Sequence, residues 1–92
     1  MPLVRLAEHA VFDDTDDAGV ILDTREGVYL TLNSTATLML REALRRDTLD
    51  EVVHHLGEQI DATTETLESG FARLTRQLRE RTLLAGEEGN RT

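Results

Sequence analysis

Apolar and polar residues alternate most regularly over residues 27–32. Apolar side chains occupy every second position there, at Val28, Leu30 and Leu32. This period predicts a β-strand with one buried face. Asn33 follows directly, and its side-chain oxygen can accept a hydrogen bond from the first turn of a helix. The chain is therefore expected to pass from a strand into a helix with almost no loop between them.

Two shorter apolar runs precede this strand. Residues 19–23 predict a strand, and the turn at residues 24–27 ends in a glycine that can adopt a positive φ. With the strand at 27–32 they predict an antiparallel hairpin. Residues 3–7 predict a first strand, which we expect to pair with 19–23 because sequence neighbours tend to be spatial neighbours. Residues 8–18 then form a connector, and the strand at 27–32 lies at an edge of the sheet.

Three amphipathic helical patterns follow the strands. The first covers about residues 35–46, the second begins at Thr48, and the third covers about residues 64–82. Thr48 and Glu51 have the spacing of a capping box, which satisfies backbone N–H groups at a helix start. Apolar residues in the third helix are spaced 4, 3 and 4 positions apart, which predicts a single apolar face.

The order of three strands followed by three helices predicts an α+β domain with a three-stranded antiparallel sheet. We expect one domain over residues 1–84, with Leu83 and Leu84 packing back onto the core. Residues 85–92 are polar and are predicted to form a disordered C-terminal tail.

Size and charge narrow the class of function. A chain of 92 residues leaves little room for a closed catalytic pocket, so binding on the outer surface is favoured. The formal net charge is −8, and no lysine is present, which argues against nucleic-acid binding. Cysteine is absent, and no long apolar run suggests a signal peptide or a membrane span. We expect a cytoplasmic protein.

Neither the acidic residues nor the histidines form a recognisable metal site. If Asp14 begins a calcium loop, Ala18 falls at the fifth position and Arg25 at the twelfth, where oxygen ligands are required. His54 and His55 are adjacent, so on a helix they point about 100° apart and cannot chelate one ion as a pair four residues apart would. No nucleophile motif or phosphate-binding glycine loop occurs. We therefore predict no metal, no cofactor and no catalytic residue.

Three motifs in a fixed order resemble the PqqD-like family, the precursor-peptide recognition elements of ribosomally made, modified peptides. They are the strand at 19–23 that ends in aspartate, the Gly-x-Tyr strand at 27–30, and the Leu-Asn pair with a later alanine at 32–36. The capped second helix and the final leucine pair agree, so the resemblance covers about residues 3–84. Thr82 stands where family members often carry a glycine that ends the third helix.

The resemblance implies a winged helix-turn-helix-like fold and a non-catalytic adaptor. Such domains bind the leader segment of a precursor peptide and present it to a processing enzyme. The short, acidic, stand-alone form is most similar to those of lasso peptide pathways, where the partner is a leader peptidase, followed by a cyclase. The alternatives are a chaperone for a radical S-adenosylmethionine enzyme in pyrroloquinoline quinone assembly, a winged-helix DNA-binding domain, and a subunit that only stabilises an enzyme.

An edge strand suits peptide binding because its unpaired N–H and C=O groups can accept an added strand. The candidate binding residues are Val28, Tyr29, Leu30, Thr31, Leu32, Leu67, Phe71, Arg73, Leu74 and Leu78. We expect Val28 and Leu30 to line the groove, Tyr29 and Thr31 to lie on the other sheet face, and Arg73 to pair with a peptide carboxylate. A leucine stripe at helical spacing is also typical of a core, so the helical positions have a structural alternative.

Overall fold

The computed structural model describes residues 2–85, so the predicted tail lies outside the described residues apart from Ala85. The chain forms three strands, β1 (Ala10–Asp13), β2 (Val20–Asp23) and β3 (Val28–Thr31), and then three helices. The helices are α1 (Ser34–Ala43), α2 (Leu49–Gln59) and α3 (Thr64–Glu80). The predicted α+β class, with an antiparallel sheet before three helices, is confirmed.

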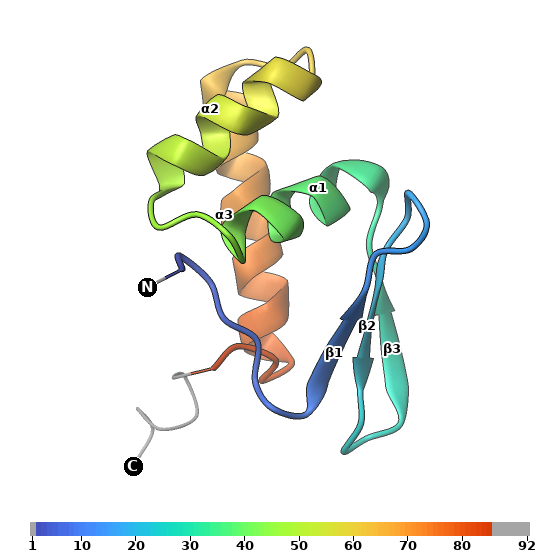
Figure 1. The fold of residues 1–92 in the computed structure, drawn as a ribbon. Coiled ribbons are helices and arrows are strands. Elements are labelled where there is room, and N and C mark those ends of the chain that lie inside the picture. The colour runs from blue at the N-terminus through green and yellow to red at the C-terminus, as the bar shows by residue number, and fades with distance from the viewer. Residues whose placement is uncertain (1, 86–92) are drawn as a thin grey trace.

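The sheet has the order β1-β2-β3, and both pairs are antiparallel. It stands to one side of the helices, with β3 as the outermost strand (Figure 1). The hairpin of β2 and β3 is closed by Asp23, whose carboxylate accepts hydrogen bonds from the N–H groups of Arg25 and Glu26. Gly27 adopts a φ of 70°, as the turn pattern predicts. The edge position of β3 is confirmed.

The predicted first strand at residues 3–7 is wrong, and so is the connector at 8–18. The strand that pairs with β2 is β1, which lies inside that connector. Residues 3–7 run instead between the end of α1 and the segment after α3. Leu6 and Leu84 form an isolated antiparallel bridge, and the Val4 N–H donates to the Ala43 carbonyl. This run therefore packs between the end of α1 and the segment after α3, with Val4 and Ala7 buried, and does not pair with the sheet.

Each helix begins at a side-chain cap that the sequence supplies. Asn33, Thr48 and Thr63 accept hydrogen bonds from N–H groups three residues later, at the starts of α1, α2 and α3. The helix ends differ slightly from the predicted limits. Helix α1 ends at Ala43, ahead of the predicted 46, and α3 ends at Glu80, ahead of 82.

The core lies where the three helices meet and extends under the inner face of the sheet. Leu40, Leu56 and Leu78 come from different helices and are fully buried, as is Ile21 of β2. Leu83 and Leu84 are buried too, so the predicted return of this pair to the core is confirmed. Because all three helices share one core, α1 and α3 are held in a fixed relation beside β3.

Candidate functional site

The outer edge of β3 carries backbone groups that no strand in residues 2–85 pairs with. The Leu32 N–H donates to the Gly19 carbonyl at 2.8 Å, so residue 32 faces β2. Backbone groups alternate in direction along an antiparallel strand. Tyr29 and Thr31 therefore direct their N–H and C=O groups away from β2, towards the free edge.

Side chains of β3 divide between the two faces of the sheet. Leu30 pairs with the buried Ile21 and Val28 pairs with the buried Asp23, so both side chains lie on the inner face. Val28 remains 47% exposed, although it belongs to that face. Tyr29 is on the outer face and is 69% exposed. The inner face at the free edge is therefore apolar and partly uncovered.

Helix α3 stands off from this edge. Within the described residues, no Cα atom of β3 comes within 8 Å of a Cα atom of α3. A strand added to a sheet lies about 4.8 Å from its neighbour. The main chain of α3 therefore leaves room for an extended chain beside β3.

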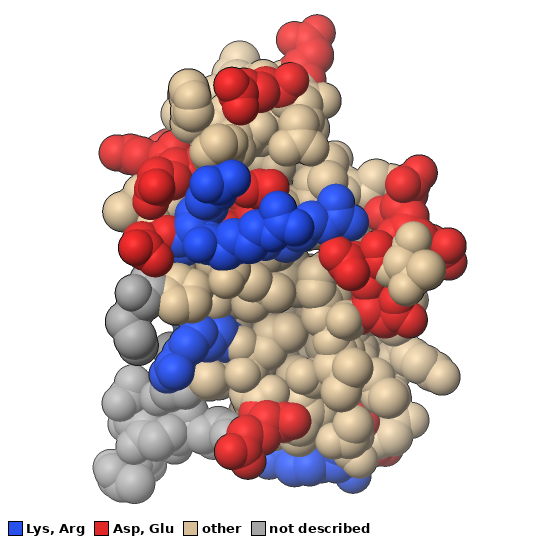
Figure 2. All heavy atoms as spheres, in the orientation of Figure 1, with Lys and Arg blue, Asp and Glu red and all other residues tan. Residues whose placement is uncertain are grey.

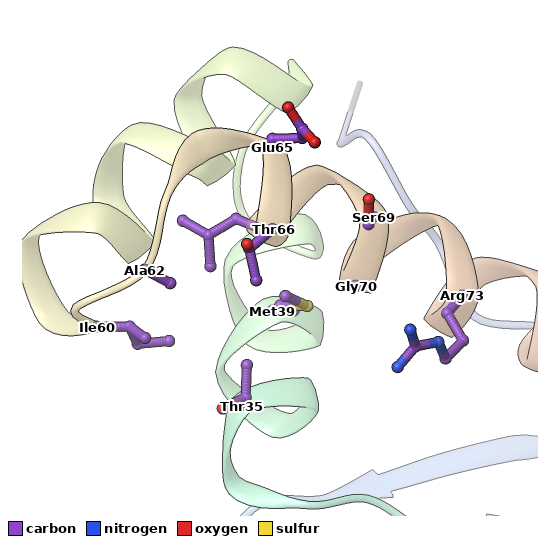
Figure 3. Close-up of a pocket in the computed structure, with 10 residues that line it drawn as sticks. Thr35, Met39, Ile60, Ala62, Glu65, Thr66, Ser69, Gly70 and Arg73 are labelled. Carbon is purple, nitrogen blue, oxygen red and sulfur yellow. The ribbon is translucent and has the colours of Figure 1, made fainter.

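Two connected hollows continue from the end of β3. The smaller, of about 200 Å³, begins at Asn33 and lies between the first turns of α1 and the middle of α3. The larger, of about 390 Å³, lies between the start of α1, the α2–α3 connection and the first half of α3 (Figure 3). Both are lined by the same four residues, so we treat them as one α1–α3 groove. The shared residues are Thr35, Met39, Gly70 and Arg73.

The predicted α3 residues occupy three different surroundings. Leu67 and Leu74 are 2% and 3% exposed, and they form part of the groove floor. Leu78 is fully buried in the core. Phe71 lies on the opposite flank of α3, where it lines a separate hollow with Leu3. The strand residue Leu32 is also buried, at 3% exposed.

Arg73 is exposed on the groove side of α3. Its side chain extends back towards Met39 and Gly70 (Figure 3). It forms no ion pair or hydrogen bond with another residue in the described part of the chain. A carboxylate in the groove would therefore meet an arginine that has no internal competitor.

Several groove residues were not singled out from the sequence. They come from α1, the α2–α3 connection and the flank of α3: Thr35, Met39, Ile60, Ala62, Gly70 and Gln77. One signal was available, because Gly70 interrupts an otherwise good helix-forming sequence. A glycine inside a helix costs about 1 kcal/mol relative to alanine, so its presence suggests a close contact.

The acidic loop between β1 and β2 is held by local contacts. The side chain and the N–H of Thr15 both donate to the Asp13 carboxylate, and these bonds lower the pKa of Asp13 from its ordinary value. Asp14 forms an ion pair with Arg41 of α1 at 2.8 Å. No group of three or more potential ligands is placed to hold a metal ion within residues 2–85.

Arginines and acidic side chains lie close together on one face of the molecule. On the face in Figure 2, arginines form a short band across the middle of the molecule, with acidic side chains at either end. Two arginines in and just after α1 are paired with carboxylates, Arg41 with Asp14 and Arg46 with Glu42. None of the helices in the described residues has the length and apolar character needed to cross a membrane.

Comparisons with known proteins agree with this arrangement. The family model described as coenzyme PQQ synthesis protein D (PqqD) matches residues 18–84. No curated protein shows significant sequence similarity to the chain.

Two solved structures share the fold over 89% of the chain. The structure of lasso peptide synthetase B1 complexed with the leader peptide is 28% identical, with a TM-score of 0.78 and 96% of that chain covered. The structure of TbiB1 in complex with the TbiA(beta) leader peptide is 21% identical, with a TM-score of 0.77 and 95% of that chain covered.

Proposed function

This chain belongs to the PqqD family, and from that premise we propose that it binds the leader segment of a ribosomally made precursor peptide. The leader adds to the sheet as a fourth strand beside β3. One observation carries the proposal: the outer edge of β3 is open in the described residues, and the α1–α3 groove begins two residues after the end of this strand. The likeness to a lasso peptide synthetase B1 that was solved with its leader peptide supports it.

The contacts available at β3 and in the groove set the expected affinity for a peptide. The outward N–H and C=O groups of Tyr29 and Thr31 each form a hydrogen bond with a net contribution of about 0.5–1.5 kcal/mol. Burying two apolar peptide side chains against Val28, Leu30 and the groove contributes about 3–6 kcal/mol before ordering costs. A dissociation constant between micromolar and tens of nanomolar is the expected range.

We further propose that the domain acts without catalysis, in the cytoplasm, and presents the leader to a processing enzyme. The lasso peptide likeness favours a leader peptidase as that enzyme, followed by a cyclase. The family model is described as a coenzyme PQQ synthesis protein, so the alternative partner is the radical S-adenosylmethionine enzyme that the family resemblance implies. Pull-down of a candidate leader peptidase with and without peptide distinguishes an adaptor from a subunit that only stabilises its enzyme.

Peptide selection followed by NMR mapping tests the binding site. Phage-displayed random peptides, long enough to span β3 and the groove, are selected on the immobilised full chain. A selected synthetic peptide is then titrated into the isotope-labelled protein. We expect the largest amide shifts along residues 27–32. Selected peptides that leave these amides unchanged, or a library that yields no binders, would contradict the proposed function.

A further inference from the structure

We infer that the outer face of the sheet is a docking surface for the enzyme that receives the bound peptide. The matching surface of this partner is apolar at its centre and carries basic side chains opposite the β1–β2 loop. The inference rests on the proposed function and adds to it the place where the partner binds, on a different face from the α1–α3 groove.

One row of apolar side chains crosses all three strands on the outer face. Val11 of β1 pairs with Leu22 of β2, and Leu22 pairs with Tyr29 of β3. Residues directly opposite each other in antiparallel strands project to the same side of the sheet. Ile21, the preceding residue of β2, is fully buried on the inner face, so the row that contains Leu22 lies on the outer face.

This row is exposed to an unusual degree for apolar side chains. Val11 is 50% exposed, Tyr29 is 69% exposed, and Leu22 between them is half-buried. None of the three belongs to the core or packs against it, since the helices lie beyond the inner face (Figure 1). The Tyr29 hydroxyl forms no hydrogen bond with another described residue. The solvated face of an antiparallel sheet ordinarily carries polar side chains, whereas an exposed tyrosine beside aliphatic groups is typical of the centre of an interface.

The β1–β2 loop gives one end of this face a negative charge. Asp13, the last residue of β1, pairs with Val20 in the next outward row. Asp16 and Asp17 follow in the loop, are exposed, and form no ion pair with another described residue. Acidic side chains gather on the corresponding side of the molecule in Figure 2. Unpaired carboxylates at this rim favour a partner with basic side chains, and they oppose a second copy of this chain, which carries the same charge of −8.

A peptide bound at the β3 edge extends the same face. In the proposed complex the added strand continues the pleat of the sheet, so every second peptide side chain projects outward beside Tyr29. A partner that covers Tyr29 therefore also contacts the bound peptide. Peptide and partner should each raise the affinity of the chain for the other by the same factor, because coupling between two binding events is reciprocal.

Val11 allows the docking surface to be altered without touching the peptide site. It belongs to β1, at the opposite edge of the sheet from β3. Val11→Lys removes apolar surface from the row and places a positive charge against the basic side chains of the partner. Ala72→Lys is the matched control, since Ala72 is exposed on α3 and lines none of the hollows beside that helix.

The test uses the full chain, a synthetic peptide selected from the phage-displayed library, and a candidate leader peptidase encoded in the same genome. Fluorescence anisotropy gives the affinity for the peptide, and surface plasmon resonance gives the affinity of the peptidase for the peptide-loaded chain. We expect Val11→Lys to bind the peptide as the wild-type chain does and the peptidase at least about tenfold more weakly. Ala72→Lys should change neither affinity. Val11→Thr, which keeps the shape and strand propensity of valine, replaces the lysine variant if circular dichroism shows that it does not fold.

The acidic rim is tested by reversing its charge. The double variant Asp16→Lys/Asp17→Lys should weaken peptidase binding by up to about fivefold, through a slower association rate. Glu58→Lys is the control, because Glu58 is exposed on α2, away from the sheet (Figure 1). An unchanged association rate in the double variant would contradict a basic partner.

A folded Val11→Lys chain that binds the peptidase as tightly as the wild-type chain would overturn the docking surface. A peptidase that does not bind the peptide-loaded wild-type chain would also overturn it. Self-association of the wild-type chain that Val11→Lys abolishes, measured by analytical ultracentrifugation, would assign the face to a second copy instead. The proposed peptide binding would survive all three results, provided that the selected peptide still shifts the amides of residues 27–32. If it does not shift them, the proposed function itself fails.

Discussion

Thr82 has a backbone conformation that is unfavourable for its residue type. Its φ is 55°, the left-handed region, and no other non-glycine residue in the described part of the chain has a positive φ. The Leu83 N–H donates to the Leu78 carbonyl and the Thr82 N–H to the Arg79 carbonyl, which is the pattern of a Schellman motif. Residue 82 therefore needs a positive φ, which glycine adopts without a steric penalty. Helix α3 ends here although residue 82 is a threonine.

Thr82→Gly should stabilise the domain. A left-handed L-residue costs about 1–2 kcal/mol, and the exposed hydrogen bond from Arg25 to the Thr82 hydroxyl recovers only part of this. We expect the free energy of unfolding to rise by about 1 kcal/mol, which is about 4–8 °C in Tm for a domain of this size. Thr82→Ala keeps the unfavourable φ and serves as the control. A Tm for the glycine variant at or below that of the alanine variant would contradict this account.

At the scale of elements, the free edge of β3 can be tested through its backbone alone. Thr31→Pro removes the outward N–H of residue 31 but no hydrogen bond to β2, and proline is tolerated on edge strands in this orientation. We expect the variant to remain folded and to bind selected peptides at least tenfold more weakly, since a lost bond leaves a buried peptide carbonyl without a donor. Thr31→Val, which changes only the side chain, is the matched control.

Circular dichroism establishes whether the proline variant is folded, and fluorescence anisotropy gives its affinity. Wild-type affinity in a folded Thr31→Pro protein would mean that peptides do not pair with this edge. Loss of binding in Thr31→Val would instead assign the effect to the side chain.

The junction between the sheet and α1 depends on one buried hydroxyl group. The Thr37 hydroxyl accepts a hydrogen bond from the Gly19 N–H at 2.7 Å and donates to the Asn33 carbonyl at 2.8 Å. A Cβ atom on Gly19 would lie 3.0 Å from both Phe12 and Thr37, so the glycine permits this close approach. The bond ties the start of β2 to the first turn of α1, and thereby places the groove beside β3.

Thr37→Val should destabilise the domain by about 1–3 kcal/mol, because the buried Gly19 N–H loses its acceptor while the shape of the side chain is kept. Chemical denaturation measures the loss. Thr75→Val on α3 is the control, since the Thr75 hydroxyl bonds only to the nearby Ala72 carbonyl at an exposed position. Equal losses in the two variants would show that the junction has no special role.

At the scale of the whole molecule, net charge should govern the rate of encounter with a peptide. The chain carries a formal charge of −8, and a field of this sign accelerates association with basic peptides. Raising the ionic strength from about 0.01 M to about 0.15 M shortens the Debye length from about 30 Å to about 8 Å. Stopped-flow measurement should give a slower association rate for a basic selected peptide and little change in its dissociation rate. A salt effect confined to dissociation would contradict this expectation.

The sequence predicted some secondary-structure elements correctly and misplaced a neighbouring one. The β2–β3 hairpin and the helix starts were predicted correctly, because alternation, a turn glycine and capping side chains act over a few residues. The first strand was misplaced. The run at residues 3–7 is held by backbone hydrogen bonds to Ala43 and Leu83, which are distant in sequence. Strand β1 gave a weak pattern, because Val11 is apolar and yet 50% exposed.

Part of the candidate site could likewise be named from the sequence, and part could not. The strand residues Val28 and Leu30 and the groove arginine Arg73 could be named from the sequence, as could Leu67 and Leu74 on the groove floor. Their role in peptide binding remains a prediction. The larger hollow of the groove could not be foreseen, since its walls come from three separate segments whose approach depends on packing.

The sequence by itself determined the local elements: a hairpin with β3 as its second strand, three capped helices and an apolar stripe on α3. Tertiary structure decided which apolar run joins the sheet, which side of α3 lines the groove, and that Gly70 lies against Met39 there. The physical reason is the separation along the chain over which each kind of interaction acts. Backbone turns and caps act between residues a few positions apart, whereas burial depends on surfaces that only the completed core brings together.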